Sequence, residues 1–244
     1  MKKILQLTTY PIDNPDHGGK LRCHNIRKSL EKEFEIKTLS FDVKENESIN
    51  NFSVILSNKI FNDVVESNLF FDWGINNYLE NNLELKKTIF NSVKEYSPAI
   101  IIVEQGFLWP LVKEMEKNST INKNVFIIYS SHNIEYQMKK EIYSTIFKNH
   151  ELEKYVNIVK EIEYDMIKNA DLILGVSDYD VNYIKKLVPN KNVYLYKNGH
   201  NGIIKTNLKE KWKEEFKISK RNWVYVASWH GPNIKGLYNL ITNG

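Results

Sequence analysis

The sequence of 244 residues contains one cysteine and lacks any long apolar run. The lone Cys23 excludes an internal disulfide framework and a multi-cysteine zinc site, and it fits a reducing compartment. No apolar stretch approaches the roughly 18 residues that a membrane-spanning helix needs. The apolar stretch near the N-terminus, residues 4–7, is too short for a secretion signal. We therefore expect a cytoplasmic protein.

Arginine is also scarce in this chain. Only three of the 34 basic residues are arginine, and the net charge is +4 because 30 residues are acidic. The lysines are scattered, whereas a nucleic-acid binder typically carries a clustered basic stripe. The sequence therefore predicts no nucleic-acid partner. Weak attraction to anionic substrates, or a peripheral contact with the inner face of an anionic membrane, is left open.

What the sequence does contain is the alternation of strands and helices that is typical of an α/β protein. Residues 3–10 predict a buried strand, residues 20–33 follow a helical spacing, and residues 35–41 predict a second strand. This succession predicts a parallel sheet with a right-handed crossover. Further strands are predicted at 99–104, 125–129, 171–176 and 193–196, and helices at 107–117, 151–169 and between Ser177 and Pro189.

Two segments interrupt this regular alternation. Residues 44–97 are rich in Asn and Lys and predict helices and loops. Near the C-terminus, the charged segment 205–221 predicts a helix or linker, and 222–228 predict a new strand, followed by a loop to 236 and a helix from Leu237. A single strand and half a helix cannot bury their own apolar faces. We interpret 222–244 as the opening of a second α/β domain, the alternative being a strand at the edge of the first sheet.

Ligands of open parallel sheets bind at the carboxyl ends of the strands, which here lead into loops 11–19, 104–110, 130–136 and 228–236. Gly18 and Gly19 directly precede the first predicted helix, where backbone N–H groups favour an anion, and Lys20 adds a cation. The alternative is a plain loop–helix junction. The glycines follow the strand too late for a dinucleotide-binding fingerprint.

His132 follows a predicted central strand and could contact a sugar hydroxyl or a phosphate; the alternative is a structural histidine. The only hard metal ligand near it in the sequence is Glu135, and the histidines lack ligand spacing, so we predict no metal. Asp178 and Asp180 form a D-x-D triplet, which a capping box with Ser177 explains better than a metal site.

Two other features have both a functional and a structural interpretation. Lys235, with Gly236, precedes the last predicted helix and could bind a diphosphate, although a surface lysine is the simpler interpretation. An aromatic group within residues 69–78 could line an acceptor site or touch lipid, but such a stripe is more often part of a core.

Taken in order, these segments resemble a GT-B-fold glycosyltransferase of the family 4 type. The resemblance covers most of the chain except about 44–97. It is carried by the opening strand 4–8 with the late Gly18-Gly19 loop, the strand that leads into His132, the stretch 163–177, Asn198-Gly199, and strand 224–228 with Lys235-Gly236.

The resemblance implies a Rossmann-like N-terminal domain on the acceptor side over 1–204, a linker or helix over 205–221, and the truncated start of a donor-side domain over 222–244. It implies a retaining transfer, without metal or other cofactor, from a nucleotide-diphosphate sugar to a cell-surface glycan or a glycolipid. The residues that match the family positions are His132 as the catalytic residue, Gly18, Gly19, Ser228 and Lys235 for the donor, and Lys20 and Glu104 for the acceptor.

The sequence departs from the family pattern in two places. Family members usually carry an arginine shortly after the first strand of the second domain, where this chain has His230. The glutamates that hold the nucleotide ribose in the family fall beyond Gly244, so we expect this chain alone to bind donor poorly and to turn over slowly or not at all. Two other functions fit the pattern: a non-catalytic Rossmann-like binding module or half of a split enzyme, and a nucleotide-sugar epimerase.

Overall fold

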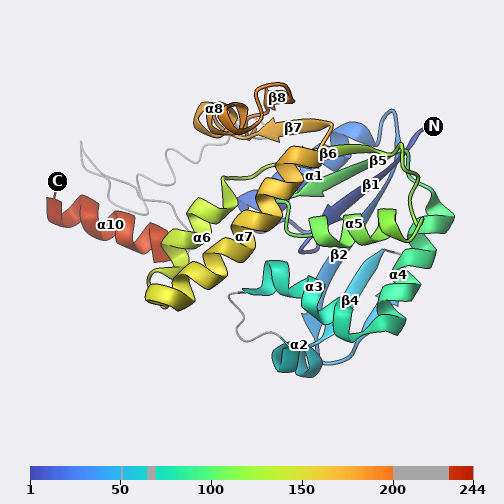
Figure 1. Cartoon of the computed structure of the whole chain (residues 1–244), viewed down its shortest axis with the longest axis horizontal. Helices are drawn as coiled ribbons and strands as arrows, with labels where there is room; N and C mark the ends of the chain where they lie inside the picture. The colour runs from blue at the N-terminus through green and yellow to red at the C-terminus, as the bar shows by residue number, and fades with distance from the viewer. Residues whose placement is uncertain (51, 65–69, 200–230, 244) are drawn as a thin grey trace, which may run out of the picture.

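The computed structural model describes residues 1–50, 52–64, 70–199 and 231–243. Its centre is an eight-stranded sheet in the order β3-β4-β2-β1-β5-β6-β7-β8, in which every pairing is parallel except that of β3 with β4 (Figure 1). The predicted α/β class with a Rossmann-like parallel sheet is therefore confirmed. The strands are Lys3–Thr8 (β1), Glu35–Lys44 (β2), Ser48–Asn50 (β3), Ser53–Ser57 (β4), Ile100–Glu104 (β5), Phe126–Ser130 (β6), Leu172–Gly175 (β7) and Asn192–Leu195 (β8).

The described helices connect the strands and flank the sheet. They are Gly18–Leu30 (α1), Asn58–Val64 (α2), Phe71–Asn81 (α3), Leu83–Tyr96 (α4), Trp109–Lys117 (α5), Glu135–Tyr143 (α6), Asn149–Asn169 (α7), Asp178–Leu187 (α8) and Gly231–Asn243 (α10). In Figure 1, α5 and α7 cross in front of the sheet and α1 lies behind it. The sheet is thus covered by helices on both faces, as parallel sheets usually are.

Alternation along the strands decides which face each side chain joins. Ile4 and Ile102 pack with Ile26 of α1 in a small cluster on one face. Their neighbours Leu5 and Ile101 belong to the main core under the other helices. Because successive side chains of a strand point to opposite faces, polar residues at even positions, such as Gln6 and Glu104, lie on the α1 side. This alternation assigns the candidate site to that side.

The segment 44–97 differs from the sequence prediction. We expected helices and loops, but strands β3 and β4 extend the sheet there before α2, α3 and α4. Helix α6 was not predicted either. The three-residue β3 carries too little apolar alternation to be recognised, and β4 is held by pairing with β2, which the local sequence does not show. The aromatic residues Phe70, Trp73 and Tyr78 are buried, so the core interpretation of that group is confirmed for the described residues.

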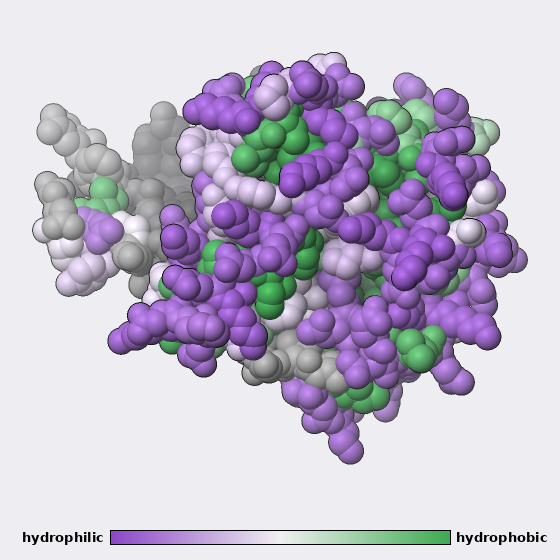
Figure 2. All heavy atoms as spheres, viewed as in Figure 1, coloured by the Kyte–Doolittle hydropathy of each residue, from purple (hydrophilic) through white to green (hydrophobic). Residues whose placement is uncertain are grey.

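The predicted segments 205–221 and 222–228 lie outside the described residues. Helix α10 begins at Gly231, six residues earlier than the predicted start at Leu237, and lies beside α6 (Figure 1). None of the described helices has the length and apolarity needed to cross a bilayer. The face seen in Figure 2 is largely hydrophilic, with hydrophobic side chains in separate patches.

Candidate functional site

The order of the strands changes direction at β1. From β1 the chain first builds the side of the sheet that holds β2, β4 and the edge strand β3, and then crosses to β5 on the other side of β1. In doubly wound sheets the loops after the two strands flanking such a point diverge and leave a crevice at their carboxyl ends, where ligands bind. The residues that follow β1 and β5 therefore frame the candidate site.

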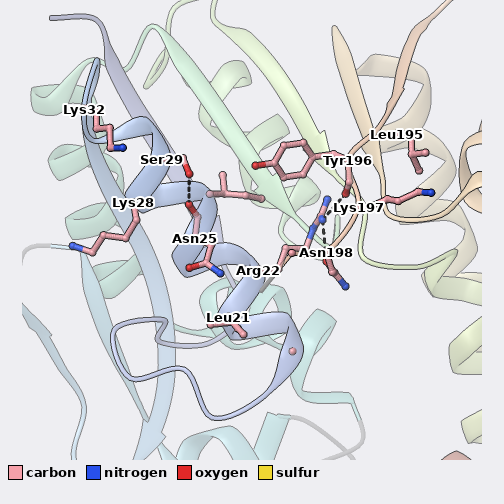
Figure 3. A pocket seen from close by; sticks show the side chains of 13 residues that line it. Leu21, Arg22, Asn25, Lys28, Ser29, Lys32, Leu195, Tyr196, Lys197 and Asn198 are labelled. Carbon is pink, nitrogen blue, oxygen red and sulfur yellow. Dashed lines mark hydrogen bonds between the residues drawn. The ribbon is translucent and has the colours of Figure 1, made fainter. Parts of the chain in front are cut away.

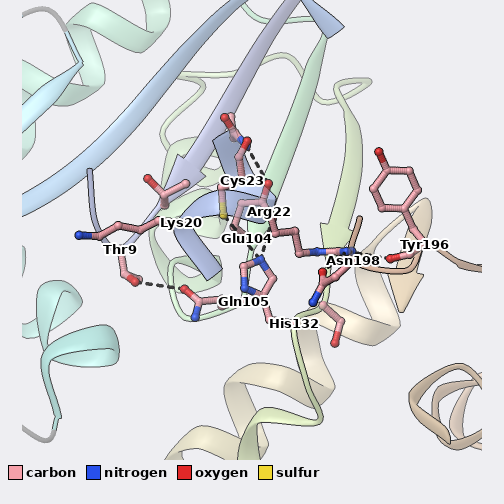
Figure 4. Close-up of polar contacts among 12 residues, drawn as sticks. Thr9, Lys20, Arg22, Cys23, Glu104, Gln105, His132, Tyr196 and Asn198 are labelled. Carbon is pink, nitrogen blue, oxygen red and sulfur yellow. Dashed lines mark hydrogen bonds and ion pairs between the residues drawn. The ribbon is translucent and has the colours of Figure 1, made fainter. Parts of the chain in front are cut away.

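Four side chains on the α1 side of this point form a connected buried cluster (Figure 4). Nε2 of His132 lies 3.0 Å from Oε2 of Glu104, and the amide of Gln6 donates to the other carboxylate oxygen at 2.7 Å. The same amide donates to the carbonyl of Cys23, whose Sγ lies 3.7 Å from Nε2 of His132. Strands β1 and β5, the loop after β6, and helix α1 each contribute one member.

Glu104 is fully buried, yet its carboxyl is held in the charged form. Burial by itself raises the pKa, but the hydrogen bond and charge of His132, with the hydrogen bond from Gln6, outweigh it and lower the pKa of Glu104. An ionised carboxylate only accepts hydrogen bonds, so Nε2 of His132 carries the proton. The pair fixes the orientation of the imidazole and leaves Nδ1 as the ring nitrogen that can meet a ligand. We expected Glu104 to contact an acceptor; its enclosed position instead gives it the role of holding His132.

The residues Cys23, Glu104 and His132 bring one potential metal ligand atom each within 4.8 Å of one another. From the sequence we expected Glu135 as the only hard ligand near His132; the structure instead places Glu104 and Cys23, from distant elements, beside it. Burial, followed by the charge of Glu104, raises the pKa of the Cys23 thiol. A protonated thiol is a poor ligand, since metals bind the thiolate. The cluster thus fits a hydrogen-bonded histidine better than a metal centre, and the absence of a metal stays a prediction.

The glycine loop meets this cluster at the start of α1. The helix begins at Gly18, and His17 caps it by accepting from the backbone N–H of Lys20 at 3.4 Å. A Cβ on Gly18 would meet nothing within 4 Å, so its backbone is open to a ligand. A Cβ on Gly19 would lie 2.6 Å from the hydroxyl of Tyr10, so that side of Gly19 is filled by the protein. The two glycines therefore have different surroundings, and Gly18 is the one with room beside it.

Lys20, which we expected at an acceptor, forms an ion pair with Asp16 at 2.9 Å within the same loop. The hydrogen bond from Lys20 is the largest cause of the lowered pKa of Asp16. Asp16 is exposed, so this pair adds little to stability. An incoming anion could compete with Asp16 for the ammonium group at small cost.

Sequence reasoning missed Arg22, which lies one turn into α1. Nη1 donates to the backbone carbonyl of Tyr196 at 2.7 Å and to Oδ1 of Asn198 at 3.0 Å. The guanidinium also faces the Tyr196 ring, 5.2 Å from its centroid. Arg22 thereby ties α1 to the segment after β8, and Figure 3 shows it reaching across a groove between them. The sequence contains only three arginines, and this scarcity was the one signal that could have drawn attention to Arg22.

A second polar cluster lies at the same edge of the sheet, toward α3 and α6. The buried Lys139 forms an ion pair at 2.6 Å with Asp72, which is partly buried. The hydroxyl of Thr9 donates to Asp72 at 3.1 Å and to Gln105 at 3.2 Å. Gln105 has a positive φ of 67°, which turns the chain sharply after β5. This cluster ties the loops after β1 and β5 to the two helices.

Glu163 of α7 anchors the loop that carries His132. Its carboxylate accepts from the backbone N–H groups of Glu135 at 2.8 Å and Tyr136 at 3.0 Å, which are the first two residues of α6. Free N–H groups at a helix start need such an acceptor. Burial raises the pKa of Glu163 to about 7, although these backbone hydrogen bonds oppose the rise. Glu135 itself is fully buried, and burial with the nearby charge of Glu163 raises its pKa well above the usual range.

The remaining predicted site residues lie elsewhere. Asp178 and Asp180 open α8; Ser177 caps that helix by accepting from the N–H of Asp180 at 3.1 Å, so the capping interpretation is confirmed. The Ser177 hydroxyl also donates to the Asp180 carboxylate at 2.6 Å. Lys235 falls in the second turn of α10 instead of the predicted loop, and Ser228 lies outside the described residues.

Comparison with known proteins leaves the family open. No protein-family model matches the sequence, and no curated protein matches it. Among solved structures, the fold resembles that of an alpha-glucosyltransferase in complex with UDP and a 13-mer DNA containing an HMU base, with 13% sequence identity and a TM-score of 0.42. The match covers 82% of this chain and 43% of the other, so this chain spans less than half of that protein's length. Similarity of this extent does not specify a function.

Proposed function

We propose that this chain is the acceptor-side part of a retaining glycosyltransferase that moves a sugar from a nucleotide-diphosphate sugar to a cell-surface glycan or lipid-linked acceptor. The observation that carries the proposal is the buried His132–Glu104 pair at the point where the strand order reverses, at the carboxyl ends of the strands. Helix α1, which contributes Cys23 to the same cluster, begins with the open backbone of Gly18. Open α/β folds bind ligands at this position. The succession of sequence segments that resembles the family 4 type supports the same assignment.

The chemistry of the site suits a sugar and its departing phosphate. The imidazole of His132 is held at Nε2 by Glu104, so Nδ1 is available for one hydroxyl of the transferred sugar. A ring fixed in this way loses little freedom when the sugar binds, which favours a precise contact. The free N–H groups at the start of α1 favour negative charge, and such charge develops on the leaving diphosphate in the transition state.

The donor-side roles are assigned to the second domain. Lys235, near the start of α10, is proposed to neutralise the diphosphate, and Ser228 to contact the donor. We expect no metal in this reaction, because the fixed cations and the helix N-terminus would supply the positive charge. The chain alone is expected to turn over slowly, so the assay should include a longer protein that contains it.

The test is release of nucleoside diphosphate from a panel of nucleotide sugars, with and without glycan and lipid-linked acceptors. We expect His132→Ala and Lys235→Ala each to reduce the rate by about tenfold or more. His150→Ala, which removes an exposed histidine on α7, is the matched control and should leave the rate unchanged. If His132→Ala and Lys235→Ala both kept the wild-type rate, as the control should, the site assignment would be wrong.

Product analysis separates this proposal from the two alternatives. A new glycosidic bond with the donor's anomeric configuration supports a retaining transferase, whereas an epimerised nucleotide sugar supports the epimerase. Saturable binding of acceptor or of a partner chain without turnover in any longer protein supports the binding module.

A further inference from the structure

The groove beside α1 is basic and shares Gly18, but no other described residue, with the site assigned so far. Its volume is about 820 Å³, and it runs from Gly18 along the helix, opposite residues 195–199 that follow β8 (Figure 3). Its described lining contains four cationic side chains and no acidic one: Arg22, Lys28, Lys32 and Lys197. Lys28 lies 3.2 Å from Glu31 and Lys197 lies 3.6 Å from Asp178, but both acids stand outside the lining. The groove therefore favours an anion.

Arg22 is the buried member of this set. It is 6% exposed, and its Nη1 already has two acceptors, the Tyr196 carbonyl and the Asn198 side chain. Nε and Nη2 are buried and have no hydrogen-bond acceptor among the described residues. Leaving charged donors unpaired in a buried position is costly. A phosphate offers oxygens at the spacing of the guanidinium fork and would satisfy them.

The groove adjoins the His132 cluster. Arg22 precedes Cys23, whose Sγ lies 3.7 Å from the imidazole. Glu104, which contacts His132 at 3.0 Å, also raises the pKa of Arg22, although burial outweighs this effect. Figure 4 shows Arg22 and His132 next to each other, directed from α1 and from the loop after β6. A ligand that carries both a sugar and a phosphate could therefore contact His132 and the groove at Arg22 at the same time.

We propose that the groove binds a phosphate or diphosphate group of a substrate through Arg22, with Lys32 and Lys197 adding attraction at longer range. The choice of a substrate rests on the proposed function, which offers two sources of this chemistry: the diphosphate of the donor and the phosphate of a lipid-linked acceptor. Binding of the anion itself does not depend on catalysis, so it can be tested separately.

The probe for the groove is inorganic pyrophosphate, titrated into the whole chain at low ionic strength and followed by calorimetry. We expect saturable binding that Arg22→Gln weakens by about tenfold or more, which corresponds to one charge-assisted hydrogen bond. Arg22→Lys should also bind less tightly, because an ammonium cannot form the fork. The matched control is Arg27→Gln: Arg27 lies on the same helix but pairs with Asp13 at 2.6 Å and does not line the groove.

Three results would overturn the assignment: no binding of pyrophosphate, equal affinity in Arg22→Gln and wild type, or an equal loss in Arg22→Gln and Arg27→Gln. If Arg22→Gln fails to fold by circular dichroism, the double variant Lys32→Ala/Lys197→Ala takes its place. A weakening of about threefold or more would then be expected from the loss of two charges, and no change would count against the groove.

Competition identifies the source of the phosphate. Displacement of pyrophosphate by a nucleoside diphosphate assigns the groove to the donor, and displacement by a short-chain polyprenyl phosphate assigns it to the acceptor. Displacement by neither would refute the link to a substrate. Pyrophosphate binding that depends on Arg22, together with no sugar transfer by any longer protein, would reject the proposed function and leave the anion site in place.

Discussion

Neutralising Glu163 should change how the stability of this protein depends on pH. The carboxyl is 2% exposed and holds the first two N–H groups of α6, directly after the loop that carries His132. Burial raises its pKa from the usual 4.5 to about 7 in the folded state. The perturbation is Glu163→Gln, which keeps an amide oxygen for the helix start and removes the titration.

The sign of the effect follows from proton binding. Between pH 4.5 and about 7 the folded protein keeps a proton on Glu163 that the unfolded chain has lost, so stability falls as the pH rises. The difference between the folded and unfolded pKa values of Glu163 corresponds to about 3 kcal/mol, at roughly 1.4 kcal/mol per pH unit. Of this, about 2 kcal/mol or more should be lost between pH 5 and pH 8. The glutamine variant should lack this loss.

The assay is urea unfolding at several pH values for wild type, Glu163→Gln and the control Glu161→Gln, an exposed glutamate on the same helix. The difference in the free energy of unfolding between wild type and Glu163→Gln should change by about 2 kcal/mol or more between pH 5 and pH 8. The free energy of unfolding of the control should follow that of wild type at a constant offset. Because the charge of Glu163 also raises the pKa of Glu135, the experiment is repeated in a Glu135→Gln background. Parallel curves for wild type and Glu163→Gln in both backgrounds would refute the reasoning.

Two further predictions concern the two polar clusters at the same edge of the sheet. Glu104→Gln preserves the shape of the side chain but removes the charge that accepts from His132, so denaturant unfolding should show a loss of about 1–3 kcal/mol, and a loss under 0.5 kcal/mol would argue against a charged pair. Asp72→Asn leaves Lys139 without its counter-charge and should cost about 3–5 kcal/mol by the same measurement. The double variant Asp72→Leu/Lys139→Met should be more stable than Asp72→Asn, and the reverse order would contradict the prediction.

The periodicity of the sequence determined most of the fold. Continuous apolar runs such as 100–103 and helical spacings such as that of α7 depend on local chemistry, so they could be predicted without tertiary information. The N-cap at Ser177 is local in the same sense, since donor and acceptor lie three residues apart. The strands β3 and β4 were missed because β4 is stabilised by pairing with β2 and β3 by pairing with β4, and no local pattern reports such pairing.

The candidate site depended on contacts that only the tertiary structure supplies. His132 could be singled out from its place after a strand, but its partners Glu104 and Cys23 are 28 and 109 residues away. Gly18 and Gly19 look equivalent in the sequence, and it is the hydroxyl of Tyr10 that fills the space beside one of them. Arg22 sits at an ordinary helical position, and its unpaired donors arise only because folding buries it against the segment after β8. Local sequence chemistry determined where the strands and helices form. The order of the strands in the sheet determined which side chains meet at their ends.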